Sequence, residues 1–344
     1  MSHRKVLIQR ALSLRQGASY PNFPLNIPAS LSWDHIQTPN RQLTRCRIVL
    51  AAHGCSVATC TMCALALDAV SPARAVTDDD WCAQLQHACT PEQEVDIITL
   101  YHNGNFFANQ EVSLARRAMV YRWFSSLQAT TLVVESLPQF ITREAIEQAN
   151  MHLRADQHLE VAIGLQSTDD FLREHVVAST CRMGHFINAT QILRAHGDEV
   201  QVFLMFQLPF LTVQESAHSL LQSLQELYTH HQVRHPTICP LRIAPRTVAY
   251  ELHRQGSLDE PSNWHLMDLL MHLHKQCPEI RPRVAVSLMA GDDGVLKAWF
   301  TKYSMEHPME TLERSVNAPP VLSYQPYQKE AVVQKIEYYM KKPI

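Results

Sequence analysis

The sequence predicts an α/β protein built on a partial (β/α)6 barrel, with a mixed, mainly helical C-terminal extension. Six short, nearly continuous apolar segments alternate with five longer segments of helical periodicity, as parallel strands and their crossover helices do. The alternation leaves room for six βα units but not for eight. After Ile243 the alternation stops, and Pro-containing segments separate the remaining elements. We therefore expect an N-terminal extension over residues 1–44, the partial barrel over 45–245 and a C-terminal, substrate-covering region over 246–344.

The expected strands are apolar on both faces, which is typical of strands buried in a parallel sheet. They are Arg47–Ala52, Val95–Tyr101, Thr131–Glu135, Leu159–Gly164, Val200–Phe206 and Thr237–Ile243. The expected helices between them are Asp78–Cys89, Gln110–Ser126, Thr142–Asn150, Gly184–His196 and Val213–His230. Thr142 and Thr212 are expected to start helices, the second with the spacing of a capping box.

Outside the barrel, the sequence predicts fewer elements. The basic N-terminus supports a weak amphipathic helix and lacks the apolar core of a secretion signal. The C-terminal region shows helical patterns at Thr247–Gln255, Trp264–Cys277 and Gln328–Lys341, and a strand pattern at Arg283–Leu288. Glycine is scarce, so Gly54, Gly104 and Gly164, each near the end of an expected strand, mark sharp turns or close approaches of the backbone.

Composition excludes several classes of protein. The 46% hydrophobic content of the 344 residues excludes a disordered or fibrous chain, and no apolar run reaches the roughly 20 residues of a membrane helix. The net charge of −3 gives no overall attraction to nucleic acid or to an anionic membrane. Nine cysteines, an odd number without a secretion signal, indicate a reducing compartment, so we expect a cytoplasmic protein with free or metal-bound thiols.

Three cysteines follow the first expected strand with the spacing C-x4-C-x2-C, at Cys55, Cys60 and Cys63. The carboxyl ends of parallel strands are where α/β proteins place their chemistry. Three thiolates can bind three irons of a [4Fe–4S] cluster and leave the fourth iron open to a substrate or cofactor. The six other cysteines show no comparable spacing. Zinc is the second interpretation, with His53 as the fourth ligand that a structural zinc site requires.

Further motifs follow the other expected strands or lie beyond them. They are Asn103–Phe106, Glu135–Pro138, Ile163–Ser167, Pro209–Thr212 and Pro261–Trp264. Together with Gly54–Cys63, these motifs resemble the radical S-adenosylmethionine (SAM) superfamily, and within it the archaeosine-forming enzymes, relatives of the elongator catalytic subunit and the methylthiotransferases. The resemblance spans about residues 45–300.

This resemblance implies a [4Fe–4S] cluster on Cys55, Cys60 and Cys63 whose open iron binds the amino and carboxylate groups of SAM. It also implies SAM contacts at the strand ends. The segment after the second strand is similar to the segment that contacts the SAM amino group in that family. The segment after the third strand is similar to one that contacts the ribose or methionine part of SAM, and the segment after the fourth strand to one that contacts the ribose. The implied SAM-binding residues are Asn103, Gly104, Asn105, Glu135, Ser136, Gln166, Ser167 and Arg173, the last as a partner for the SAM carboxylate.

Each of these residues also has an ordinary structural interpretation. An Asn- and Gly-rich segment such as 103–105 is typical of a β-turn. Glu135 can be a solvated loop carboxylate, although a carboxylate that faces into a barrel is costly unless it is paired. Arg173 can be a surface arginine on the following helix.

The sequence departs from the family pattern mainly in the part that would face the substrate. Ala64 replaces a glycine after the third cysteine, Gln207-Leu208 replaces a basic residue, and residues 176–180 lack an expected lysine. The C-terminal part has the sequence Leu288–Gly294 and no cysteine after Cys277, where the family carries a Cys-containing stretch.

The resemblance therefore implies a radical SAM enzyme that cleaves SAM to a 5′-deoxyadenosyl radical and abstracts hydrogen from a substrate. Because the chain is nearly neutral and lacks the expected lysines, a small molecule of a specialised biosynthetic pathway is the preferred substrate. A tRNA-modifying lyase of the archaeosine type and a non-catalytic iron–sulfur or zinc protein are the alternatives. The expected partner is an electron donor such as flavodoxin or ferredoxin. We expect no membrane partner, and the sequence carries no signal for an oligomeric state.

Overall fold

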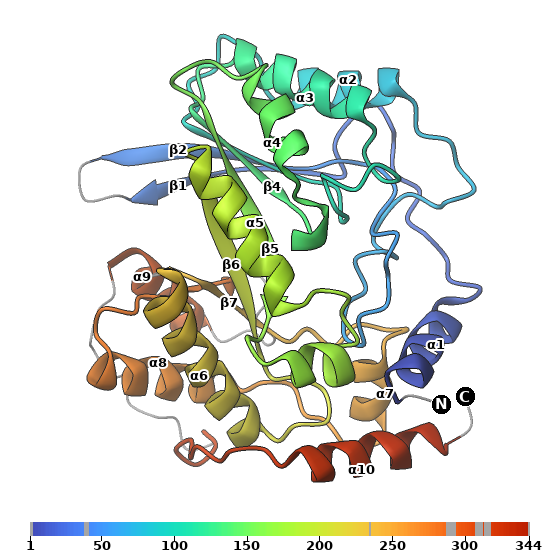
Figure 1. Cartoon of the computed structure of the whole chain (residues 1–344), viewed down its shortest axis with the longest axis vertical. Helices are drawn as coiled ribbons and strands as arrows, with labels where there is room; N and C mark the ends of the chain where they lie inside the picture. Colours follow the sequence, from blue (N-terminus) through green and yellow to red (C-terminus); the bar gives the residue numbers. More distant parts are fainter. Residues whose placement is uncertain are drawn as a thin grey trace.

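The computed structural model describes residues 3–37, 41–233, 235–286, 294–306, 312 and 318–342. Its centre is a single eight-stranded sheet in which the strands follow chain order from β1 to β8. The first pair is antiparallel and every later pair is parallel. The sheet is strongly curved (Figure 1), and helices pack along its outer side. The predicted partial barrel is therefore confirmed.

The strands are β1 Ser30–Gln37, β2 Gln42–Val49, β3 Ile97–Tyr101, β4 Thr131–Glu135, β5 His158–Gln166, β6 Glu199–Phe206, β7 Thr237–Pro240 and β8 Arg283–Val284. The helices are α1 His3–Arg15, α2 Asp78–Ala88, α3 Leu114–Ser126, α4 Arg143–Asn150, α5 Met183–Ala195, α6 Val213–His231, α7 Val248–Arg254, α8 Asn263–Gln276, α9 Gly294–Glu306 and α10 Lys329–Met340. Two short helices complete the described elements, the 3-10 helix η1 Pro138–Phe140 and the π-helix η2 Leu172–Val177.

The two faces of the sheet differ in chemistry, because alternate residues of a strand point to opposite sides. The outer face is apolar and packs in the main hydrophobic core under the helices, with the buried residues Cys46, Ile48, Ile98, Leu100, Leu132, Val134, Leu159, Val161, Ile163, Val202, Leu204 and Ile238. The concave face carries polar side chains at the intervening positions, including Arg47, Thr99, Tyr101, Glu135 and Glu160. A polar inner face of this kind is suited to binding a polar ligand.

The caps predicted from the sequence are present. The Thr142 hydroxyl accepts from the Ala145 amide, and Thr212 and Glu215 form a reciprocal capping box at the start of α6. These side chains satisfy amides that the first helical turn leaves without partners.

The sheet differs from the prediction in three places. β1 was not predicted, because Ser, Asp and His interrupt its apolar residues; it is fixed by pairing along its whole length with β2 and by Asp34, which accepts from Arg45 at 2.8 and 2.7 Å. The first predicted strand, Arg47–Ala52, in fact runs from Gln42 to Val49. The strand predicted at Arg283–Leu288 is only Arg283–Val284, and Leu288 lies outside the described residues.

The first and last helices of the described chain, α1 and α10, lie side by side (Figure 1). The predicted N-terminal helix is present as α1, and it packs against α7, α10 and η2 (Figure 1). Leu7 and Ala11 of α1 join Val332 and Ile336 of α10 in a second hydrophobic cluster. The division into three parts stays a prediction.

A search of the described helices for one long and apolar enough to cross a membrane finds none.

Candidate cluster and cofactor site

The three cysteines of the C-x4-C-x2-C motif lie on the long loop between β2 and α2, which we call the cysteine loop (residues 53–64). Backbone contacts fix this loop at both ends. The Cys55 amide donates to the carbonyl of Asn103 at 2.9 Å, and the Thr61 amide donates to that of Val177 at 2.9 Å. The buried Thr61 hydroxyl also donates to the Val176 carbonyl at 2.7 Å. The loop is thus attached to the end of β3 and to the π-helix after β5.

The thiols of the cysteine loop lie close enough to influence one another. Burial raises the pKa of all three thiols, that of Cys63 to about 11, and neighbouring cysteines add to the increase for Cys60 and Cys63. The Arg15 guanidinium acts in the opposite direction on the pKa of Cys60 and Cys63. Iron would have to displace the protons from these thiols, which is the usual coupling of metal binding to deprotonation.

The donor set of three thiols matches the three-thiolate ligation of a cubane cluster with one open iron. In the part of the chain that the structure describes, no three His, Cys, Asp or Glu side chains converge on one point. A [4Fe–4S] cluster needs no such convergence, since each thiolate binds a different iron. Nε2 of His53, the fourth ligand in the zinc interpretation, donates to the Arg74 carbonyl at 2.8 Å.

Glu111 holds the cysteine loop and the end of β3 together, and the sequence analysis missed it. Its Oε1 accepts from the Ser56 amide, the Ser56 hydroxyl and Nδ2 of Asn105 at 2.9, 2.6 and 2.9 Å, and Oε2 accepts from the Asn105 amide. Burial opposes ionisation, but hydrogen bonds from His102, Ser56 and Asn105 lower the pKa of Glu111 to about 2. No motif marks Glu111, which lies in a turn before α3.

Two of the three glycines singled out in the sequence are needed for close backbone packing here. A Cβ on Gly104 would lie 2.8 Å from Nε2 of His102 and 3.2 Å from the Cys55 amide nitrogen. A Cβ on Gly54 would lie 2.9 Å from Cβ of Ala69. The contacts of 2.8 and 2.9 Å are shorter than a real Cβ accepts. These glycines therefore let the strand end and the cysteine loop approach each other.

The Asn103–Asn105 segment has a positioning role in the structure. Asn103 adopts a positive φ of 61° and donates from Nδ2 to the Asp68 carbonyl at 2.6 Å. Asn105 is buried, and its Nδ2 lies 3.4 Å from Sγ of Cys55 while its Oδ1 accepts from the Leu137 amide at 2.9 Å. Asn105 therefore connects the cysteine loop, β3 and β4, and a contact of this segment with SAM stays a prediction.

Glu135 and Ser136 at the end of β4 leave polar groups without described partners. The Ser136 hydroxyl is buried and makes no hydrogen bond within the described residues. Burial raises the pKa of the Glu135 carboxyl to about 7, and the structure gives this side chain no ion pair among the described residues. Glu135 also lies close enough to Cys63 to raise the pKa of that thiol. A buried hydroxyl without a described partner and a carboxylate close to Cys63 fit a polar ligand such as SAM.

Replacing Glu135 with glutamine is expected to change how the stability of the metal-free protein depends on pH. The folded-state pKa near 7 exceeds the ordinary value of 4.5, so the folded chain binds this proton more tightly than the unfolded chain. Stability present below pH 4.5 is therefore lost as pH rises to 7, by about 3 kcal/mol at most. Urea unfolding at several pH values should show this loss in the wild type and in the exposed control Glu147→Gln, and a smaller loss in Glu135→Gln. Parallel curves for all three proteins would contradict the assignment.

Gln166, Ser167 and Arg173 lie where the chain leaves β5, but they face different neighbours. Gln166 follows a bulge in β5 and has a positive φ of 69°. The buried Ser167 hydroxyl contacts the Ser223 hydroxyl of α6 at 3.4 Å.

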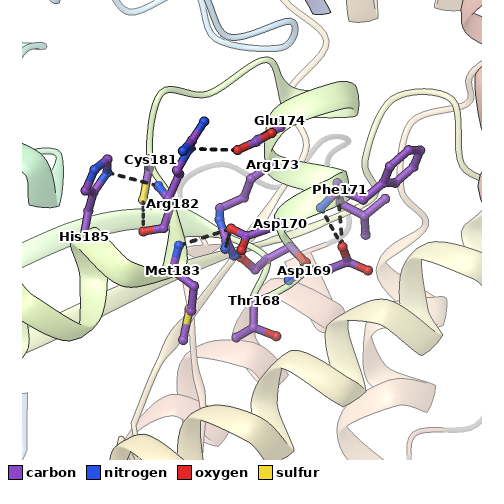
Figure 2. A network of polar contacts seen from close by, with 12 residues as sticks. Thr168, Asp169, Asp170, Phe171, Arg173, Glu174, Cys181, Arg182, Met183 and His185 are labelled. Carbon is purple, nitrogen blue, oxygen red and sulfur yellow. Dashed lines mark hydrogen bonds and ion pairs between the residues drawn. The ribbon is translucent and has the colours of Figure 1, made fainter.

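Arg173 is fully buried, so the interpretation as a surface arginine is wrong. Its guanidinium donates to the Ser167 carbonyl and to Asp170, whose carboxylate also accepts from the Met183 amide at 3.1 Å (Figure 2). Binding of SAM by Gln166, Ser167 and Arg173 stays a prediction.

The concave face continues the polar character of the site below the strand ends. Burial, Glu135 and Glu160 together raise the pKa of the Tyr101 phenol, while Arg47 acts in the opposite direction. These groups therefore surround Tyr101 on one face of the sheet. The Thr99 hydroxyl on the same face is buried without a partner among the described residues. The face offers carboxylates, a phenol and a guanidinium to a ligand.

Two pockets outlined by the described residues lie elsewhere. One, of about 430 Å³, opens between η1, α4 and α5, and the other, of about 320 Å³, lies between α6 and the start of the β5–α5 connection. Neither is lined by a cysteine of the cysteine loop. The cluster and cofactor site is therefore defined by the cysteine loop and by the polar residues at the ends of β3 and β4. The stretch 287–293, where the sequence departs from the family pattern, lies outside the described residues.

Comparisons with known proteins agree with the strand-end motifs. No protein-family model matches the chain. Archaeosine synthase subunit beta of Methanosarcina acetivorans is 24% identical over 281 residues, which are 80% of this chain and 80% of that protein. The subunit of the same name from Thermococcus kodakarensis is 22% identical over 128 residues, 37% of this chain and 39% of that protein.

A solved structure supports the fold. The crystal structure of methylornithine synthase matches 99% of this chain and 89% of its own length, with a TM-score of 0.53 at 12% identity. This likeness shows a shared fold. The chain is thus a partial-barrel relative of archaeosine synthase subunit beta, and the resemblance to the archaeosine-forming radical SAM enzymes is confirmed over four fifths of its length.

Proposed function

We propose that the protein is a radical SAM enzyme. The observation that carries the proposal is the cysteine loop, which brings three thiols to the carboxyl ends of parallel strands, beside unsatisfied polar groups and a polar concave face. A [4Fe–4S] cluster and SAM, when bound, would supply one-electron cleavage of SAM and the radical that abstracts hydrogen from a substrate.

In this proposal, the residues of the chain bind and position. Cys55, Cys60 and Cys63 hold the cluster, and Asn105 and Glu111 keep Cys55 at the end of β3. Glu135 and the Ser136 hydroxyl are available to the amino and hydroxyl groups of SAM, since neither has a described partner. The helices on the outer face keep water away from that side of the sheet.

The concave face suggests what kind of substrate is bound. Glu160 and Tyr101 can accept from an amine or hydroxyl group, and Arg47 can meet an anionic or carbonyl group. The substrate is therefore polar and carries donors as well as acceptors. The near-neutral charge of the chain favours a small molecule.

A tRNA-modifying lyase is the second candidate. The similarity to archaeosine synthase subunit beta favours it, because that similarity covers most of both chains. In this case the concave face would receive a single modified base, while the rest of the RNA would lie outside the barrel.

Substrate-dependent SAM cleavage tests both candidates. Reconstituted protein is incubated anaerobically with SAM and dithionite, together with total tRNA or with a tRNA-free extract of small metabolites. The proposal predicts that one fraction raises 5′-deoxyadenosine several-fold above the substrate-free level, and ribonuclease treatment shows whether tRNA is responsible. A cluster-loaded protein that forms no 5′-deoxyadenosine under any of these conditions would contradict it.

A further inference from the structure

Arg15, the last residue of α1, reaches into the cysteine loop from a distant part of the sequence. Its side chain is only 8% exposed, and Nη2 donates to the carbonyls of Cys60 and Cys63 at 2.9 and 2.6 Å. The N-terminal helix thus places a permanent positive charge directly against the backbone of two predicted cluster ligands.

The rest of the guanidinium has no partner in the part of the chain that the structure describes. Nε and Nη1 of Arg15 are buried without a hydrogen bond among the described residues, and no carboxylate of the described chain forms an ion pair with this side chain. A buried cation without a counter-charge is costly. Such a group indicates that a negative charge absent from the polypeptide lies beside it in the functional protein.

The other arginines of the same helix make no hydrogen bond to the cysteine loop in the described structure. Arg10 pairs with Glu251 at 2.8 Å and also contacts the Tyr339 hydroxyl. Arg4 donates to the Ser179 carbonyl at 3.2 Å, and its Nε is likewise buried without a partner among the described residues. Arg15 alone of these three contacts the cysteine loop.

We infer that Arg15 is the counter-cation of the iron–sulfur cluster and raises its reduction potential. This inference rests on the proposed function. A [4Fe–4S] cluster in its oxidised, 2+ state with three thiolates carries a net charge of about −1, and gains a second negative charge when one external electron reduces it. A fixed positive charge nearby stabilises the reduced state more than the oxidised state. Arg15 is therefore a positioning residue that acts through the cluster.

The test is a redox titration, monitored by electron paramagnetic resonance, of reconstituted protein without SAM. Arg15→Gln is expected to make cluster reduction about tenfold less favourable, a midpoint lower by 59 mV for a one-electron couple. Arg15→Lys keeps the charge and should stay near the wild type. Arg4→Gln removes the same charge from the same helix and should also match the wild type. Iron and sulfide content of each variant is measured in parallel.

Three results would overturn the inference. The first is a wild-type potential in Arg15→Gln. The second is an equal decrease in Arg4→Gln, which would show only a long-range effect of charge. The third is an unchanged potential with weaker SAM binding in Arg15→Gln, which would make the SAM carboxylate, and not the cluster, the partner of Arg15. If Arg15→Gln does not retain a cluster, the Arg15→Lys variant tests the inference. Loss of the cluster in Arg15→Lys as well would show that the contacts of Arg15 with the two carbonyls matter and that its charge does not. A wild type that never binds a cluster would instead reject the proposed function.

Discussion

Replacing Cys60 with alanine is expected to abolish cluster binding and SAM cleavage together. Cys60 lies in the middle of the cysteine loop, close enough to Cys55 and Cys63 for each to raise the pKa of its thiol. Two remaining thiolates cannot hold a cubane cluster in the three-ligand arrangement. Iron content should fall to near zero, and 5′-deoxyadenosine should stay at background.

A matched control separates this effect from a loss of any cysteine. Cys82 lies on α2, outside the cysteine loop, so Cys82→Ala should bind iron and cleave SAM as the wild type does. Circular dichroism should be unchanged in both variants, because Cys60 is only partly buried and the backbone contacts of its loop remain. Full iron loading of Cys60→Ala would refute the ligand assignment.

The second large effect is expected at Glu111. Glu111→Ala removes the acceptor for four hydrogen bonds from Ser56 and Asn105 and leaves buried donors unsatisfied. A pKa near 2 against an ordinary value of 4.5 corresponds to roughly 3 kcal/mol of stabilisation at neutral pH. This stabilisation is present above pH 4.5 and is lost as pH falls toward 2. Glu111→Ala should therefore lower the free energy of unfolding of the metal-free protein by about 3 kcal/mol near pH 7.

Urea unfolding followed by tryptophan fluorescence measures this loss. Glu111→Gln keeps the shape and one acceptor oxygen, so it should lose less, while Glu147→Ala on the exposed side of α4 should lose little. A Glu111→Ala protein as stable as Glu147→Ala would show that the hydrogen bonds around Glu111 contribute nothing.

The central part of the fold could be predicted because its signals are local. Buried parallel strands are continuously apolar, so β3 to β7 were located within a few residues. β1 could not be found this way, because an edge strand with one exposed face needs no continuous apolar run and is stabilised by its pairing with β2. The length of β8 likewise depends on its pairing with β7, which involves only Arg283 and Val284 of β8.

The site was predictable as far as motif spacing extends. The three cysteines and the crowded Gly54 and Gly104 could be identified from the sequence, since each lies just after a strand. Glu111 and Arg15 could not, because their roles arise only when distant segments meet: Arg15 is 45 residues from Cys60, and Glu111 is 55 residues from Ser56. The burial of Arg173 could not be predicted either, because it depends on a π-helix that no sequence pattern indicated.

The central claim is that the cysteine loop holds a cluster that makes SAM reactive. The most direct test is anaerobic reconstitution of the wild-type chain with iron and sulfide, followed by addition of dithionite and SAM. If the cysteine loop holds a [4Fe–4S] cluster, the protein should bind about four iron atoms per chain and form 5′-deoxyadenosine. A protein that binds stoichiometric zinc, takes up no iron and forms no 5′-deoxyadenosine would contradict it.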